Sequence, residues 1–146
     1  MTSWRDVATA NPELAAFVAD RLRAAPCYLA TVRASGAPRV HPVTPILTDA
    51  GLYVFMEPTS PKGADLRERA WFALHNGVPD NSGTGGEASV VGSGHPVEDA
   101  AIRAEVVAAA SYGPADHYVL FELQPTEVRS NGYGDVVLPE HQSWKA

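Results

Sequence analysis

The sequence predicts a mainly β fold, an antiparallel barrel of about six strands with peripheral helices, in a single domain of residues 1–146. Six segments rich in strand-forming residues follow one another, and short turns separate several of them. Consecutive strands joined by short turns favour antiparallel pairing over a parallel sheet. Closing such a sheet into a barrel removes most of its exposed edges. The length of 146 residues suits one domain with its own core.

The first predicted element is a helix over about residues 12–24. Asn11 is a suitable cap, Pro12 fits the first turn, and Glu13 complements the positive end of a helix. Its apolar face carries residues at helical spacing: Leu14, Phe17, Val18 and Leu22. The helix is expected to end before Pro26, because a residue that precedes proline avoids helical geometry.

Three strand-like segments come next, over residues 28–33, 39–47 and 52–56. The short turns between them predict an antiparallel meander. Pro42 and Pro45 interrupt the second segment, and proline has no N–H to donate to a sheet ladder. We therefore expect this strand to lie at an edge or to be bulged, with backbone groups open to a ligand.

The second half of the chain predicts two further helices and three further strands. A short polar helix over 62–69 has Ser60 as its expected cap and Pro61 at its first position. A longer helix is expected to run from its cap, Asp99, to about residue 110. The remaining strands are expected over residues 71–75, 88–97 and 118–130, with a break in the last one at Pro125.

Composition and charge argue against several classes of function. A net charge of −6 without a block of basic residues speaks against nucleic-acid binding. Cys27 is the only cysteine, which rules out an internal disulfide, and its apolar neighbours predict a buried thiol. The five histidines include no closely spaced pair, so no metal site is expected. No signal pattern and no membrane-length apolar run occurs, which favours a cytoplasmic protein without membrane contact.

A candidate anion site lies where the short polar helix begins. The first turn of a helix offers unpaired N–H groups and partial positive charge, which together attract phosphate. Ser60 adds a hydroxyl and Lys62 adds a full charge. Arg39, from a neighbouring strand, can clasp the same anion with two parallel hydrogen bonds. The alternative is that Ser60 only caps the helix and Lys62 points into solvent.

The run from Leu29 to His75 resembles the pyridoxamine 5′-phosphate oxidase-like family of flavin-binding split β-barrels. The matching segments are LATVRASGAPRVHPV and LYVFMEPTSPKGADLRERAWFALH. In the family, as in this chain, a strand with a Gly-x-Pro turn is followed by Ser-x-Lys at a helix start, and then by an aromatic-Ala-Leu-His strand. The C-terminal residues 142–146 include a Trp but lack the Arg pattern of the name-giving oxidase. We therefore do not expect oxidation of pyridoxamine phosphate.

The resemblance implies a homodimer that holds its cofactor in a cleft at the interface between the two copies. The family's phosphate-contacting positions match Arg39, Ser60 and Lys62. The strand segment that lies beside the ring system in the family matches His41, Pro42, Val43 and Thr44. Members of this family hold FMN, the deazaflavin F420, haem or biliverdin.

The function expected from this resemblance is that of an oxidoreductase dependent on a flavin or a deazaflavin. Hydride would pass between the bound ring and a small-molecule substrate, and no catalytic side chain can be named. FMN is the favoured cofactor and F420 the alternative, for which Arg67 and Arg69 would supply a basic channel unless they face solvent. The alternative function is a non-catalytic module that binds FMN, F420, haem or biliverdin for storage or sensing.

Overall fold

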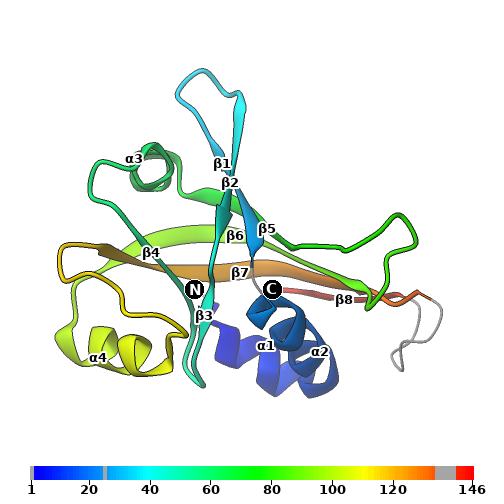
Figure 1. Cartoon of the computed structure of the whole chain (residues 1–146). Helices are drawn as coiled ribbons and strands as arrows, with labels where there is room; N and C mark the ends of the chain where they lie inside the picture. Colours follow the sequence, from blue (N-terminus) through cyan, green and yellow to red (C-terminus); the bar gives the residue numbers. More distant parts are fainter. Residues whose placement is uncertain (1, 25, 134–140) are drawn as a thin grey trace.

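The computed structural model describes residues 2–24, 26–133 and 141–146, and in them one antiparallel sheet curls into a half-barrel (Figure 1). The helices are α1 (Trp4–Ala10), α2 (Pro12–Arg23), α3 (Pro61–Arg69) and α4 (Ala100–Ala109). The strands are β1 (Cys27–Val32), β2 (Pro38–Val43), β3 (Ile46–Leu47), β4 (Leu52–Met56), β5 (Trp71–Asn76), β6 (Glu87–Val97), β7 (Val119–Asn131) and β8 (His141–Lys145). The predicted mainly β class, with an antiparallel split barrel and peripheral helices, is confirmed.

The order of strands across the sheet is β2-β1-β5-β6-β7-β4-β3, and β8 pairs with β7. The sheet therefore has eight strands where the sequence predicted six. Both hairpins of the expected meander form, β1 with β2 and β3 with β4, but the predicted strand 39–47 is divided into β2 and β3, which lie at opposite edges of the sheet. The backbone crosses between these edges at Thr44 and Pro45, where prolines limit ladder pairing. This crossing links the two edge strands, β2 and β3, between which the half-barrel is open.

Two predictions about the later strands also need correction. Pro125 does not break β7, which is one continuous strand, but the pairing of β7 with β6 shifts register between Val91 and Gly92 of β6, where Thr126 is the extra residue of β7. The hydroxyl of Thr126 donates to the Val91 carbonyl across this irregularity, over 3.1 Å. The bulge interrupts the hydrogen-bond ladder locally at the position where Pro125 has no N–H to donate, so the strand can continue beyond it. The strand β8 was not predicted.

The N-terminal part contains the expected helix and one that was missed. In α2 the side chain of Asn11 accepts from the Leu14 amide, and the predicted apolar face is buried. The missed helix, α1, starts with a capping box in which Ser3 and Asp6 satisfy each other's backbone amides. Both helices pack on the main core beneath the sheet.

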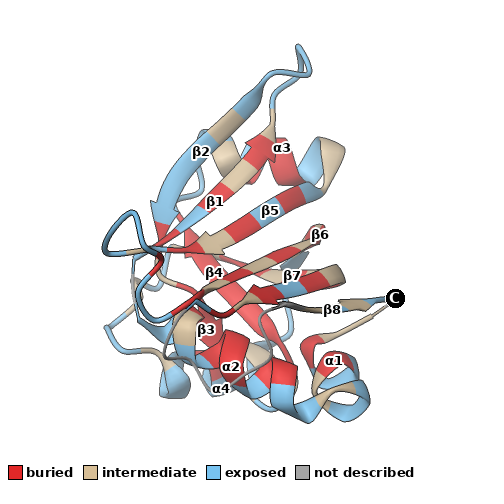
Figure 2. Ribbon diagram, turned by 90° about the vertical axis from the view of Figure 1, so that its right-hand side faces the viewer, coloured by how far each residue is buried: buried red, intermediate tan, exposed pale blue. Residues whose placement is uncertain are grey.

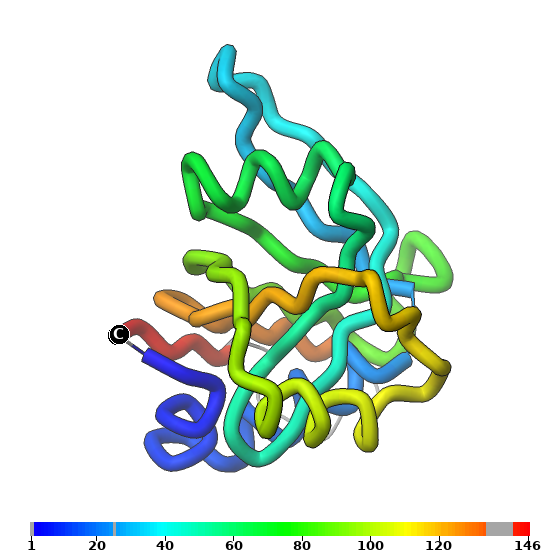
Figure 3. Tube along the Cα trace, turned by 90° about the vertical axis from the view of Figure 1, so that its left-hand side faces the viewer, coloured from blue at the N-terminus to red at the C-terminus, as the bar shows by residue number. Residues whose placement is uncertain are grey.

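Three of the helices and the β1–β2 hairpin lie at opposite ends of the barrel (Figure 3). The helices α1, α2 and α4 gather at one end, whereas the β1–β2 hairpin and α3 lie at the other. Buried residues line the inner face of the sheet, and the outer face of β2 is exposed (Figure 2). A second, smaller core lies beneath α4, and its buried members are Ile46, Tyr53, Phe55, Val106 and Leu120. Among the described residues, no helix has the length and apolar character needed to span a membrane.

Candidate functional site

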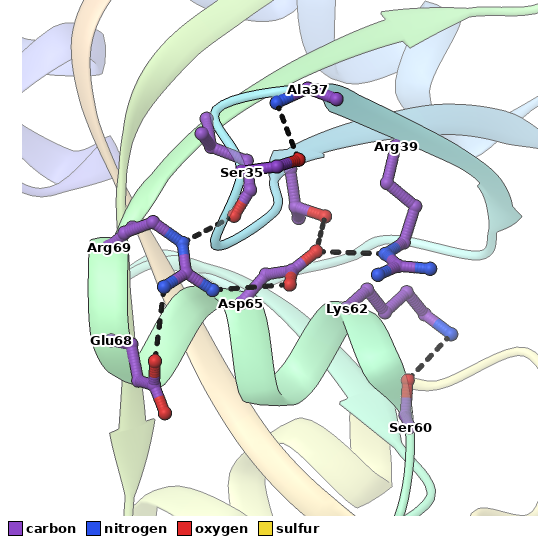
Figure 4. A network of polar contacts seen from close by, with 10 residues as sticks. Ser35, Ala37, Arg39, Ser60, Lys62, Asp65, Glu68 and Arg69 are labelled. Carbon is purple, nitrogen blue, oxygen red and sulfur yellow. Dashed lines mark hydrogen bonds and ion pairs between the residues drawn. The ribbon is translucent and has the colours of Figure 1, made fainter.

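A buried carboxylate, Asp65 on α3, organises the region between this helix and the β1–β2 hairpin (Figure 4). Its side chain accepts hydrogen bonds from the hydroxyl of Thr31, over 2.7 Å, and from Nε of Arg39, over 2.9 Å. Arg69 approaches the other carboxylate oxygen at 3.4 Å. Burial alone would raise the pKa of Asp65, but these hydrogen bonds and the two guanidinium charges outweigh it and lower the pKa below 3.8.

Arg39 is fixed by this carboxylate in a particular direction. Only its Nε is used by Asp65, and its terminal nitrogens have no partner within the residues that the structure describes. Figure 4 shows the guanidinium end of Arg39 and the ammonium end of Lys62 on the same side of α3. Two cationic donors from separate elements therefore face a common space at the start of this helix.

Ser60 and Lys62 occupy the first turn of α3. Ser60 stands at the N-cap position, as predicted, but its side chain makes no capping hydrogen bond. Its buried hydroxyl accepts instead from Nζ of Lys62, over 3.3 Å. The helices α1, α2 and α4 all have a side-chain cap, so the first turn of α3 differs from theirs. Partial burial lowers the pKa of Lys62, because desolvation disfavours the charged ammonium, and an anion beside Nζ would oppose this effect.

A cavity of about 360 Å³ opens beside Lys62. One wall is the crossing between the sheet edges, with Pro42, Val43 and Thr44, all predicted to lie beside a ring. The opposite wall consists of Phe55, Met56, Glu57, Tyr112 and Tyr118, and Pro26 completes the lining. The size lies in the range of small-molecule sites, and the lining combines aromatic and aliphatic side chains with the polar groups of Thr44, Glu57 and Lys62.

The structure brings together part of the predicted site. Lys62 and the segment Pro42–Thr44 line one cavity, and Arg39 and Ser60 lie at the Lys62 side of it. His41 is exposed on β2, opposite Leu29 of β1, and does not line the cavity.

Several residues around the cavity were missed by sequence reasoning. Tyr112 and Tyr118 reach the cavity because α4 packs beside it, and no local sequence pattern indicates where α4 packs. Asp65 sits in a polar helix and looked like a solvated charge in the sequence. A possible signal was its position three residues after Lys62, on the same short helix.

The proposed basic channel of Arg67 and Arg69 is not part of this cavity. Arg69 donates to the Val32 carbonyl over 2.7 Å and to Glu68 over 3.0 Å, besides its approach to Asp65. These contacts tie α3 to the hairpin. Arg67 is exposed, and its guanidinium lies 5.6 Å from the ring centre of Phe121.

Other candidate groups have structural roles or none. Cys27 is buried as predicted, and burial raises the pKa of its thiol to about 11, which makes it unreactive. His75 is partly buried in β5, and its Nε2 lies 3.1 Å from Glu87. Among the described residues, no three metal-binding side chains gather closely enough to hold an ion.

The family model described as pyridoxamine 5′-phosphate oxidase matches residues 10–132 of this chain. No curated protein matches the sequence. Solved structures do share the fold. The chain resembles a heme binding protein from Mycobacterium smegmatis at TM-score 0.67 and 19% identity, over 89% of this chain and 57% of that one. This chain thus spans less than two thirds of that protein.

Two further structures match over most of both chains. The heme storage protein HutZ from Vibrio cholerae has TM-score 0.62 and 21% identity, over 79% of this chain and 89% of that chain. PhzG from Burkholderia lata 383, in complex with tetrahydrophenazine-1-carboxylic acid, has TM-score 0.60 and 15% identity, over 97% and 91%. At these identities the likeness shows the common fold.

Proposed function

Since this chain belongs to the pyridoxamine 5′-phosphate oxidase family, we propose that it binds a phosphorylated flavin, FMN, and works as a flavin-dependent oxidoreductase. The observation that carries the proposal is the convergence of two cations on the uncapped first turn of α3, at the side of a cavity with aromatic walls. A phosphate suits the cationic end and a planar ring suits the cavity. When bound, the flavin ring would supply the hydride chemistry.

The phosphate end of the site is built from three side chains. The terminal nitrogens of Arg39 would donate to phosphate oxygens in parallel, while Asp65 keeps the guanidinium in place. Lys62 would exchange its contact with Ser60 for the anion, and the hydroxyl of Ser60 would then be available as a further donor. The amides of the first helical turn add partial positive charge in the same place.

The ring end would lie along the crossing at Val43 and Thr44. Prolines on either side of these residues limit ladder pairing, so backbone groups can hydrogen-bond a ring edge. Apolar side chains on both walls would exclude water from the ring faces. The chain's own residues would thus orient the cofactor and shield it, and the substrate would approach the ring from the open side.

The Lys62→Ala variant is expected to bind FMN about 1.5–3 kcal/mol more weakly, because it loses one charge-assisted hydrogen bond. This corresponds to roughly a 10- to 150-fold increase in Kd. Titration of the purified protein, followed by flavin fluorescence, measures the change. Lys145→Ala is the matched control, because the only other lysine lies exposed on β8. Equal affinity of the Lys62 variant and the wild type would remove Lys62 from the site.

The second candidate function is a non-catalytic module that stores or senses FMN, F420, haem or biliverdin. Two proteins with a similar fold are named as a heme-binding and a heme-storage protein, which supports a binding module as the second candidate. Separate titrations with FMN, F420 and haem distinguish the ligands. Bleaching of the bound-flavin absorbance by a reduced nicotinamide cofactor would then favour the enzyme over the module.

We further propose that the protein forms a homodimer through the outer face of β1, β2 and β5, with the cofactor cleft beside the interface. Large apolar side chains are exposed on this face: Tyr28 by 45%, Val40 by 66% and Trp71 by 56%. The strand registers place them on the same side of the sheet, and Trp71 also lines an apolar hollow of about 210 Å³. Exposed patches of this kind mark interaction surfaces, and a second copy offers the same patch in a twofold arrangement.

The wild-type protein is therefore expected to sediment as a dimer at micromolar concentration. Val40→Glu would place a charge in the centre of the apolar face, so we expect this variant to sediment as a monomer. Glu13→Gln, on the exposed surface of α2, is the control and should remain dimeric. A wild-type monomer that still binds the cofactor would contradict this interface.

A further inference from the structure

We propose that residues 111–118, the segment between α4 and β7, form an aromatic wall that selects a planar ring ligand, and that Arg103 is its positioning residue. This inference rests on the proposed function, because the wall belongs to the same cavity. It adds Arg103 on α4, which does not belong to the phosphate-binding residues Arg39, Ser60 and Lys62. It also predicts which part of the ligand the wall recognises.

Arg103 joins α4 to this segment through three carbonyl groups. One terminal nitrogen donates to the Tyr118 carbonyl over 2.8 Å. The other donates to the carbonyls of Asp116, over 3.1 Å, and Ala115, over 3.3 Å. A single guanidinium thus fixes three backbone positions close together in the sequence. Hydrogen bonds from a charged donor are stronger than neutral ones, so the contact is well suited to hold a short loop.

The same guanidinium also connects the loop to β4, the other element of this cavity wall. Its carbon lies 5.0 Å from the ring centre of Phe55 on β4, which lines the cavity. A turn within the segment, with the Tyr118 amide bonded to the Ala115 carbonyl at 3.0 Å, has both ends on Arg103. Loop, helix and strand therefore meet at one side chain.

A second contact holds the segment at the cavity mouth. Nε2 of His117 lies 3.1 Å from the carboxylate of Glu57, which also lines the cavity. The imidazole ring packs edge-to-face against Tyr118, with the ring centres 5.0 Å apart. The result is a wall with Tyr112 and Tyr118 beside Phe55, all facing the same space.

This composition recognises a flat π system rather than an anion. Aromatic pairs contribute stabilisation beyond the area that they bury, provided that the ligand presents a ring face or edge. An aliphatic phosphate would meet the cations at the other end and gain nothing from the tyrosines. The wall and the phosphate end therefore make separable contributions to affinity.

Three ligands separate these contributions: FMN, riboflavin, which has the ring without the phosphate, and inorganic phosphate as a competitor of FMN. Tyr112→Leu removes the ring and keeps an apolar side chain, whereas Tyr112→Phe keeps the ring. We expect Tyr112→Leu to weaken FMN and riboflavin alike, by about three- to tenfold. Competition by inorganic phosphate should stay unchanged, and Tyr112→Phe should restore the affinity for both flavins.

Arg103→Gln tests the positioning role through hydrogen exchange as well as affinity. The amides of 111–118 should exchange faster in this variant than in the wild type, even without a ligand, and riboflavin should bind about three- to tenfold more weakly. Riboflavin should protect these amides in the wild type, while inorganic phosphate should not. Arg23→Gln, on the exposed surface of α2, is the matched control.

The outcomes distinguish the inference from the proposed function. Riboflavin binding that is unaffected by both Tyr112→Leu and Arg103→Gln, with FMN binding still dependent on Lys62, overturns the aromatic wall and leaves the proposed function standing. A wild type that binds neither FMN nor riboflavin overturns the proposed function, and the wall falls with it. Loss of riboflavin affinity in both variants, with phosphate competition intact, supports the wall.

Discussion

The Asp65→Ala variant is expected to lose about 3 kcal/mol of unfolding free energy, because it removes one partner of a buried ionic network. Arg39 would keep part of its hydration, since it lies near the surface, but the buried Thr31 hydroxyl would lose its acceptor. Chemical denaturation monitored by fluorescence measures the change. Asp20→Ala is the control, because its side chain is exposed, and we expect a shift of at most about 0.5 kcal/mol.

The same carboxylate is also expected to act on ligand affinity through Arg39. Asp65→Asn keeps the shape of the side chain and removes its charge, so the guanidinium would lose its fixed direction. FMN affinity should fall in this variant, but no further change should follow when Asp65→Asn is added to Arg39→Ala. Such non-additivity is the signature of one residue acting through another. Fully additive losses would show that Asp65 supports the fold alone.

Gly92→Ala is expected to be at least as damaging, with a loss of about 3 kcal/mol or more. Gly92 lies in β6 at the bulge, opposite Pro125. A methyl group there would collide with the Gln124 carbonyl and lie 2.9 Å from Cα of Pro125. These are backbone atoms in the longest strand pair of the sheet, so they can move only by disturbing its ladder.

Thermal unfolding by circular dichroism tests this expectation. Gly113→Ala is a matched control, because a methyl group at that position meets no atom within 4 Å. The control should change stability by less than about 0.5 kcal/mol. If both glycine variants unfold at the wild-type temperature, the close approach of β6 and β7 at the bulge is absent in solution.

Sequence reasoning succeeded where the determinants of structure are local. The helix α2 follows from its cap and the spacing of its apolar residues, and β1, β4 and β5 follow from short runs of strand formers. The helix α1, which was not predicted, also has a local signal in the spacing of Ser3 and Asp6. The separation of β2 from β3 has no local signal, because it depends on which distant strands each of them pairs with.

The residues of the site also divide into those that local sequence predicts and those that depend on the packing of distant elements. Lys62, Ser60 and the segment at Val43 are adjacent to recognisable turns and a helix start, so sequence pattern and family resemblance indicate them together. The tyrosine wall depends on where α4 packs, and the role of Asp65 depends on how the β1–β2 hairpin lies over α3. Charges in short polar helices usually face solvent, so an exception such as Asp65 is recognised only in three dimensions.

The order of strands also determines when the cavity can exist during synthesis. One wall belongs to β4, and β4 is held in the sheet by β7, through pairs such as Tyr53 with Glu122. A ribosome must therefore deliver most of the chain before these pairs form. Contacts between such distant segments slow folding, and the waiting strands expose unpaired edges meanwhile. The wall formed by β4 therefore takes its place only after β7 has been synthesised, so ligand binding follows the pairing of these strands.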